Sequence, residues 1–164
     1  MEKRVSAGTD IAKGLFCFYC VVMLWLLFGQ RIGDGAGGTY SEQLHGNLNV
    51  IPFKTIIWFV TVGDKTSNQY LLRHAFVNLV GNVVLFIPAG FFLPCIWRSM
   101  RAFWKLLLCF TGLILAVEIL QLITLLGSCD IDDLILNIVG ATLGYGIWKL
   151  YGILRKRKKT GNNN

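Results

Sequence analysis

Long apolar segments alternate with short polar segments along most of this chain. Each long segment has the length, or nearly the length, of a helix of about 20 residues that crosses about 30 Å of hydrocarbon. The pattern therefore predicts an all-α, polytopic membrane protein with four transmembrane helices. The expected spans cover residues 11–29, 76–97, 103–126 and 134–154.

The segment between the first two spans, residues 30–75, carries a weaker apolar run at 50–62. That run is too short to span the membrane and contains Pro52 and Lys54, so we expect a short interfacial or re-entrant helix there. The glycine-rich stretch at 33–38 is expected to be a flexible linker, because no strand precedes it and no Lys-Ser or Lys-Thr pair follows it.

Composition agrees with this prediction. Hydrophobic residues make up 54% of the chain, its mean hydropathy is +0.57, and charged residues make up only 15%. A soluble domain would carry about 25% charged residues. With 164 residues the chain has room for one domain, which we place at 1–164.

The net charge of +7 is concentrated where it would meet membrane headgroups. Basic residues precede the first span, lie between the second and third spans, and fill much of the tail 155–164, whereas the turn between the third and fourth spans carries aspartates and no Lys or Arg. The positive-inside rule then predicts that both termini are cytoplasmic and that this turn and the segment 30–75 face outward. Nucleic acid is not expected as a partner, because no nucleic-acid-binding motif accompanies the basic tail.

Polar side chains within and beside the spans converge on one depth in the outer half of the membrane. With a rise of about 1.5 Å per residue, those inside the spans lie roughly 6 to 12 Å below the outer surface, although neighbouring spans run in opposite directions. They recur every three or four residues, which puts those of each span on one helix face. We therefore predict one outward-facing polar pocket. Its expected ligand-binding residues are Arg73, Asn78, Asn82, Glu118, Gln121, Asp130, Asp133 and Asn137.

These residues, and the neighbouring Asp132 and His74, also have structural interpretations. Amides such as that of Asn82 commonly hold membrane helices together, through bonds of only about 0.6 kcal/mol on average. Glu118 is less suited to that role, because a carboxylate inside a span is costly. Asp132 is expected to be a solvated turn residue, or a charge at a helix N-terminus. Arg73 and His74 are either countercharges for the acids or ordinary interface anchors.

Glycine and proline positions add two expectations. Gly140 and Gly144 form a GxxxG pattern, which permits close contact between helices. Pro88 interrupts the backbone hydrogen bonds of the second span, and Gly90 and Pro94 follow closely. We expect this helix to be kinked or broken, which would open a cavity between spans.

Four blocks of the sequence occur in a distinctive order and spacing: 47–56 (NLNVIPFKTI), 78–90 (NLVGNVVLFIPAG), 118–121 (EILQ) and 130–140 (DIDDLILNIVG). Together they resemble the VanZ-like family of small membrane proteins, and the resemblance covers most of the chain. Many members carry an arginine shortly before the aspartate turn, where this chain has Gly127 and Ser128. If that arginine supplies a countercharge, Arg73 is the expected replacement.

The resemblance implies an integral membrane protein of the bacterial cell envelope, and some relatives lower sensitivity to teicoplanin-type glycopeptide antibiotics. It supplies no reaction and no catalytic residues. Our leading hypothesis is a non-enzymatic protein whose polar pocket engages an envelope lipid, a lipid-linked wall precursor or a lipoglycopeptide-type antibiotic, with no cofactor and no bound metal. One alternative is an intramembrane acid- or metal-dependent lipid-modifying enzyme that uses Glu118, Asp130 and Asp133. Another is a small proton-coupled transporter that uses Glu118 as its proton site.

Overall fold

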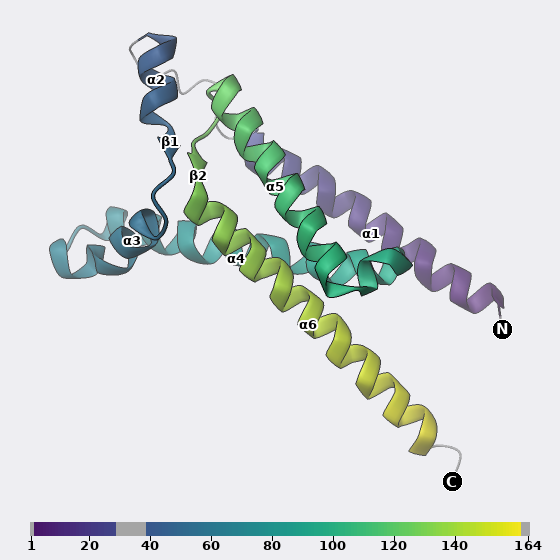
Figure 1. The fold of residues 1–164 in the computed structure, drawn as a ribbon. Helices are drawn as coiled ribbons and strands as arrows, with labels where there is room; N and C mark the ends of the chain where they lie inside the picture. The colour runs from purple at the N-terminus through teal and green to yellow at the C-terminus, as the bar shows by residue number, and fades with distance from the viewer. Residues whose placement is uncertain (1, 29–38, 162–164) are drawn as a thin grey trace.

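Four long helices carry most of the chain (Figure 1). The computed structural model describes residues 2–28 and 39–161, so the linker expected at 33–38 lies outside the described residues. All four helices are long and apolar enough to cross a membrane, which confirms the prediction of a mostly helical, multi-pass membrane protein. They are α1 (Glu2–Phe28), α4 (Gln69–Ile96), α5 (Phe103–Thr124) and α6 (Ile131–Gly161).

Three of these helices extend beyond the predicted spans, and α1 does so at its start, since it begins at Glu2. α4 begins at Gln69 because Asn68 caps it: the side-chain oxygen of Asn68 accepts a hydrogen bond from Tyr70 N at 3.0 Å. α6 begins at Ile131 and continues to Gly161, so the basic stretch expected as a separate tail is the last part of this helix. Lys and Arg are good helix formers, which allows the helix to continue through them.

α4 remains one continuous helix through Pro88 and Pro94, so the expectation of a break is wrong. Neighbouring helices and local adjustments can satisfy the backbone groups that a proline frees, which is why membrane helices tolerate it. An apolar cavity nevertheless borders α4 close to Pro88, at Ala89 and Leu93.

α4 and α6 pack at very close range through glycines on both helices. A Cβ atom added at Gly90 would lie 2.0 Å from the backbone of α6, and one added at Gly144 would lie 2.0 Å from Ile87 O. At Gly140 the nearest atom would be Val83 O, at 2.1 Å. The GxxxG pattern therefore brings α6 against α4 within a single chain.

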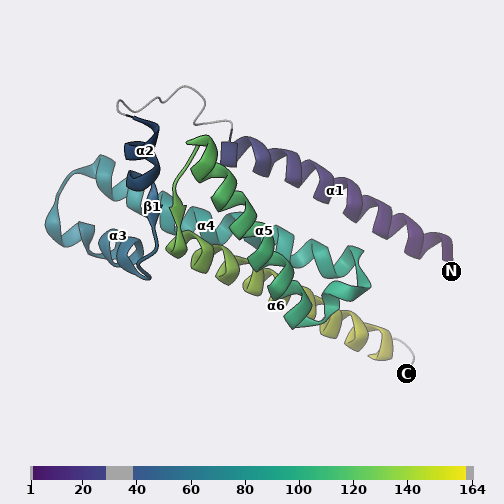
Figure 2. The same ribbon diagram turned by 45° about the horizontal axis from the view of Figure 1, so that its top comes forward.

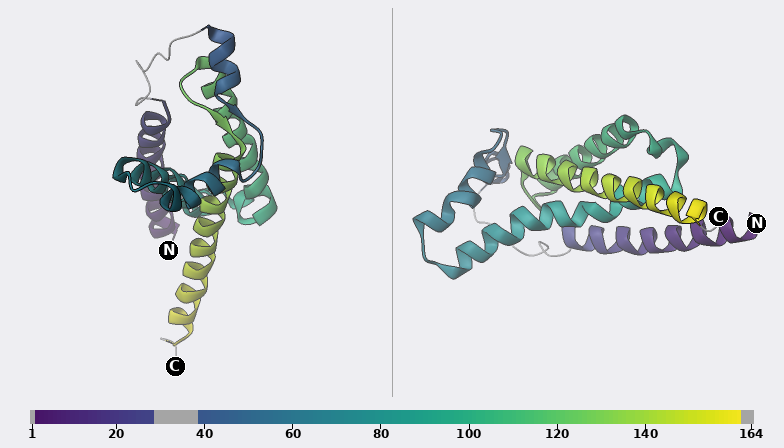
Figure 3. Two further views of the ribbon diagram at one scale, coloured as in Figure 1. Left: turned by 90° about the vertical axis from the view of Figure 1, so that its left-hand side faces the viewer. Right: turned by 90° about the horizontal axis from the view of Figure 1, so that it is seen from below.

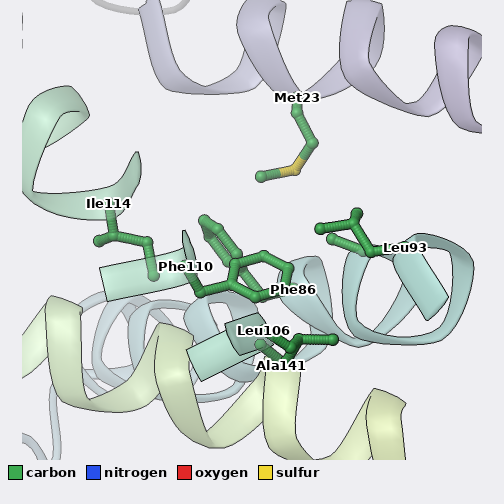
Figure 4. Packing of buried hydrophobic residues seen from close by; sticks show 8 residues of the cluster. Met23, Phe86, Leu93, Leu106, Phe110, Ile114 and Ala141 are labelled. Atoms are coloured by element: carbon green, nitrogen blue, oxygen red, sulfur yellow. The ribbon is translucent and has the colours of Figure 1, made fainter. Parts of the chain in front are cut away.

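The hydrophobic core lies where the long helices meet (Figure 4). Phe86 from α4 and Phe110 from α5 make an edge-to-face contact, with ring centroids 6.3 Å apart. Leu106 and Ile114 from α5 are each 1% exposed, and Met23 reaches into the same cluster from α1. Many other apolar side chains on these helices are exposed, which is the pattern of helices that turn their outer faces to lipid.

A small layer closes one end of the four helices (Figure 1). It consists of α2 (Tyr40–Gly46), β1 (Leu48–Asn49), α3 (Lys54–Lys65) and β2 (Cys129–Asp130). The two strands pair in parallel, with Leu48 opposite Cys129 and Asn49 opposite Asp130. α3 is the short helix expected near 50–62, whereas the sequence pattern predicts neither α2 nor the strands.

The two described chain ends both lie away from this layer, at the far ends of α1 and α6, and are separated from each other (Figures 2 and 3). A short 3₁₀ helix, η2 (Arg98–Arg101), connects α4 to α5. An even number of spans places both termini on one side of a membrane. Which side that is remains the prediction made from the basic residues, that is, the cytoplasmic side.

This topology predicts a labelling result. In a variant without the five native cysteines, Ser128→Cys should react with a membrane-impermeant thiol reagent in intact cells. Ser99→Cys, in the exposed η2 connection, is the matched control and should react only after lysis. Mass spectrometry of the labelled protein measures both. The reverse pattern would show that the charge rule assigns the wrong side.

Candidate functional site

Asp132 joins the start of α6 to the start of α3. Its carboxylate accepts hydrogen bonds from the backbone N–H groups of Phe53, of Thr55 at 2.7 Å and of Ile56 at 3.0 Å. Thr55 and Ile56 belong to the first turn of α3, where backbone N–H groups have no partner within the helix, and Phe53 directly precedes α3. Asp132 is 0% exposed, so the expectation of a solvated turn residue is wrong. It is a helix N-terminal charge, and the helix it caps is α3.

The same contact accounts for an unusual backbone conformation. Phe53 has a φ of 65°, a left-handed value that non-glycine residues adopt at a cost of about 1–3 kcal/mol and only where their surroundings impose it. The hydrogen bond from Phe53 N to Asp132 holds the turn in this conformation.

The carboxylate of Asp130, the last residue of β2, accepts hydrogen bonds from three residues. Its Oδ2 accepts from Thr55 Oγ1 at 2.6 Å, and its Oδ1 accepts from Asn49 Nδ2 at 3.1 Å and from Asp132 N at 2.9 Å. Only 7% of Asp130 is exposed. Two aspartates of one turn thus bind the same short segment, from β1 to the start of α3.

Glu118 ties this arrangement to α5. Its Oε2 accepts a hydrogen bond from Asp130 N at 3.1 Å, and only 5% of the residue is exposed. Glu118 is therefore a buried acid held against the turn that contains Asp130.

A second group of contacts joins α6 to α4. Asn82 Nδ2 donates to Asp133 Oδ1 and, at 3.5 Å, to Asn78 Oδ1. Asp133 follows Asp132 directly, so both groups of contacts meet in one turn. We call them together the outer polar cluster, after the side of the membrane predicted for this turn from the basic residues. It comprises Asn49, Thr55, Asn78, Asn82, Glu118, Asp130, Asp132 and Asp133.

Two buried amide oxygens at the cluster accept no hydrogen bond from the described residues: Asn49 Oδ1 and Asn137 Oδ1. The orientation of Asn49 is fixed, because its Nδ2 already donates to Asp130 and, at 2.9 Å, to Thr55 Oγ1. Asn137 lies one helical turn after Asp133 on α6 and is 4% exposed. A buried acceptor without a donor costs about 1–3 kcal/mol, so these two oxygens are suited to a ligand that brings donors.

Gln121 and Arg73 are not part of these contacts. Gln121 is buried, and its Nε2 donates to Leu27 O at 2.8 Å, so it joins α5 to α1. Arg73 is exposed and lies nine residues before Asn82 on α4, about 180° around the helix. His74 is exposed and lies near the rings of Phe59 and Tyr70, with centroids 6.2 and 6.4 Å away. The structure does not bring Arg73 to the acids as their countercharge.

Sequence reasoning missed Asn49 and Thr55 as members of the cluster. The available signal was their place in the block 47–56, one of those that carry the family resemblance. Nothing in their spacing shows that they meet the aspartate turn, because the contacts join residues 75 to 81 positions apart.

The cluster is chemically a set of hydrogen-bond acceptors. Among the described residues, no three His, Cys, Asp or Glu side chains form a group that could hold a metal ion. Burial raises the pKa of the Cys129 thiol, and the nearby carboxylates of Glu118 and Asp130 raise it further. Since the thiolate is the reactive form, Cys129 is a poor nucleophile at neutral pH.

Comparison with known proteins gives a consistent assignment. The family model described as VanZ/LLP1 matches residues 16–154. A curated relative, "Protein VanZ" of Enterococcus faecium, is 31% identical over 150 residues, which cover 91% of this chain and 78% of the relative. No solved structure matches the chain. The four membrane-span candidates and these matches together show that the chain belongs to the VanZ/LLP1 family of membrane proteins.

Proposed function

We propose that this protein is a non-enzymatic component of the bacterial cell envelope whose outer polar cluster binds the polar part of an amphipathic molecule. The candidate ligands are an envelope lipid, a lipid-linked wall precursor and a lipoglycopeptide-type antibiotic. Binding would lower sensitivity to glycopeptides such as teicoplanin. The name of the Enterococcus faecium relative supports this only as a likeness between the two chains.

The observation that carries the proposal is a pair of buried acceptors, the side-chain oxygens of Asn49 and Asn137, which accept nothing from the described residues. Glu118, Asp130 and Asp132 are almost fully buried too, but they already accept hydrogen bonds from within the chain. Hydroxyl, amide and ammonium groups of a sugar, peptide or lipid headgroup are the donors that such acceptors bind.

The contacts give less support to the enzyme alternative. A general acid or base needs a carboxyl oxygen within reach of its substrate. Both oxygens of Asp130 already accept hydrogen bonds from within the chain, and both oxygens of Asp132 accept from the backbone of α3. These two acids therefore support the fold around the cluster. The test of charge is made instead at Glu118 and Asp133, which are also bonded within the chain.

The test replaces each of these two acids with its amide. In Glu118→Gln and Asp133→Asn, the remaining carbonyl oxygen can still accept from Asp130 N or Asn82 Nδ2, so folding should change little. If charge matters, each variant should lose the cellular phenotype. The measurement is teicoplanin susceptibility of a strain that depends on this gene, together with mass-spectrometric identification of lipids that co-purify with each variant.

Asp10→Asn is the matched control, since Asp10 is an exposed acid on α1. Thermal unfolding in detergent separates loss of function from loss of fold. Wild-type susceptibility and unchanged co-purified lipids in both amide variants would show that the acids act as structural contacts, and would end the proposal of a charged site.

A further inference from the structure

A second feature of the molecule is an apolar cavity of about 450 Å³ between α1, α4 and α5. Figure 4 shows part of its wall, with Met23 reaching down from α1 toward Phe86 on α4 and Phe110 on α5. Its volume is within the range of cavities that hold small molecules in proteins, about 300–1,000 Å³. It is separate from the outer polar cluster, since it contains none of that cluster's residues.

The walls of this cavity select against polar ligands. Nearly all lining side chains are hydrocarbon, aromatic or sulfur-containing. The hydroxyl of Tyr19 is already engaged, since it donates to Leu85 O at 2.7 Å. An apolar cavity of this kind does not hold water favourably, because water needs several polar partners. The chemistry therefore points to a hydrocarbon occupant.

The cavity is long in the direction of the helices. On α1 its lining extends from Phe16 to Leu27, about 16 Å at the rise of an α-helix. On α5 it extends from Cys109 to Val117, about 12 Å. These lengths are roughly half the thickness of the hydrocarbon layer, and the end of the cavity away from Leu27 is lined by Trp97, Ser99 and Met100 at η2. A single extended chain matches this shape better than a compact molecule does.

The rim of the cavity faces the bilayer. Leu24 on α1 and Leu113 on α5 line the cavity but remain 58% and 54% exposed. In a membrane, the molecules in contact with such side chains are lipids. Bilayer lipids are therefore the most concentrated candidate occupants at this rim, and molecules dissolved in water are not.

One end of the cavity adjoins the outer polar cluster. Leu27 and Val117 line that end. The carbonyl of Leu27 accepts the hydrogen bond from Gln121, and Val117 precedes Glu118 in the chain. A molecule with its chain in the cavity would thus have its polar group near Gln121 and Glu118.

We propose that the cavity holds one acyl chain of a bilayer phospholipid, with the headgroup at the end where Gln121 joins α5 to α1. This inference rests on the proposed function, and it adds that the ligand is recognised by its hydrocarbon chain as well as by its polar part. Gln121 then acts as a positioning residue that holds α1 over the cavity.

The experiment uses a phosphatidylglycerol that carries a photoreactive diazirine in one acyl chain, incorporated into vesicles with the full-length protein. After illumination, mass spectrometry of peptides maps the attached label. Label should concentrate on cavity-lining residues of α1 and α5. Leu113→Trp and Cys109→Phe, which fill the cavity from its exposed side, should each reduce this labelling about tenfold.

Leu108→Trp is the matched control. Leu108 also lies on α5, but it is 72% exposed and does not line the cavity, so the substitution should leave cavity labelling unchanged. Thermal unfolding in detergent verifies that all three variants are folded. Two cavity positions keep the test valid if one variant fails to fold.

Uniform labelling around α5, or labelling that neither cavity variant reduces, would overturn the inference, whatever the amide variants of Glu118 and Asp133 do. Cavity labelling combined with normal drug susceptibility in both amide variants would retain the chain site and remove the proposed function of the polar cluster. The two ideas therefore fail by different measurements.

Discussion

Asp132→Ala should release α3 from the rest of the protein and lower the free energy of unfolding by about 3 kcal/mol or more. The substitution removes the acceptor of three backbone N–H groups at a site that is 0% exposed. Each buried donor left without a partner costs about 1–3 kcal/mol. Phe53 would also lose the contact that holds its left-handed backbone. Thermal unfolding in detergent measures the loss, and limited proteolysis at the start of α3 locates it.

Two other substitutions make this prediction specific. Asp132→Asn keeps one acceptor oxygen and should fall between wild type and alanine. Asp10→Ala removes an exposed acid and should leave stability and proteolysis unchanged. Equal stability of Asp132→Ala and wild type would mean that the α3 contact contributes nothing to the fold.

Gly140→Ala should be, with Gly144→Ala, among the most damaging single-methyl additions in α6. The new Cβ would lie 2.1 Å from Val83 O, where the obstacle is backbone and cannot rotate away. α4 and α6 would have to separate, and overpacking of this kind costs about 1–3 kcal/mol, occasionally more. We expect a large decrease in the yield of folded protein, measured by size-exclusion chromatography and thermal unfolding.

Gly146→Ala is the matched control, because a Cβ at Gly146 meets no atom within 4 Å. It lies on the same helix and should be neutral or slightly stabilising, since alanine has the higher helix propensity. If Gly140→Ala and Gly146→Ala behaved alike, the close approach of the two helices would not be a requirement of the fold.

The sequence predicts the four spans well because bilayer thickness imposes a length that apolar runs must meet. Charged residues predict the positions of helix ends less well. The basic residues after residue 154 mark the end of the apolar run, but α6 continues to Gly161 because nothing in those residues stops a helix. Likewise Pro88 and Pro94 indicate a break that tertiary packing prevents.

Parts of the candidate site could also be predicted, for a similar reason. The helical spacing and depth of Asn82, Glu118 and Asp133 follow from the rise of a helix, and the structure finds Asn82 bonded to Asp133 and Glu118 bonded to Asp130. The same reasoning from spacing and depth fails for Asp132. An aspartate in a turn with two others resembles a solvated residue, and its partners are backbone N–H groups, which no side-chain pattern reveals.

Arg73 shows a different limit of prediction from the sequence. A need for countercharge suggested it as the partner of the acids, because it lies near the predicted outer surface. Helical phase puts it on the face of α4 opposite Asn82, and the acids Asp130 and Asp132 are satisfied by neutral donors instead. Hydrogen bonds from the backbone and from amide and hydroxyl groups can stabilise a buried carboxylate without a cation.

The pairing of β1 with β2 has a consequence for how the protein is made. Leu48 and Cys129 are neighbours in the sheet but 81 positions apart in the chain. α4 and α5 lie between these strands in the chain. In the topology predicted from the basic residues, the pairing cannot form until both helices have been inserted and the turn that carries Asp130 has crossed the membrane. Until then the first turn of α3 has no carboxylate to cap it. Contacts between such distant segments form slowly. In that topology, closure of the small layer formed by α2, β1, α3 and β2 follows the insertion of α4 and α5.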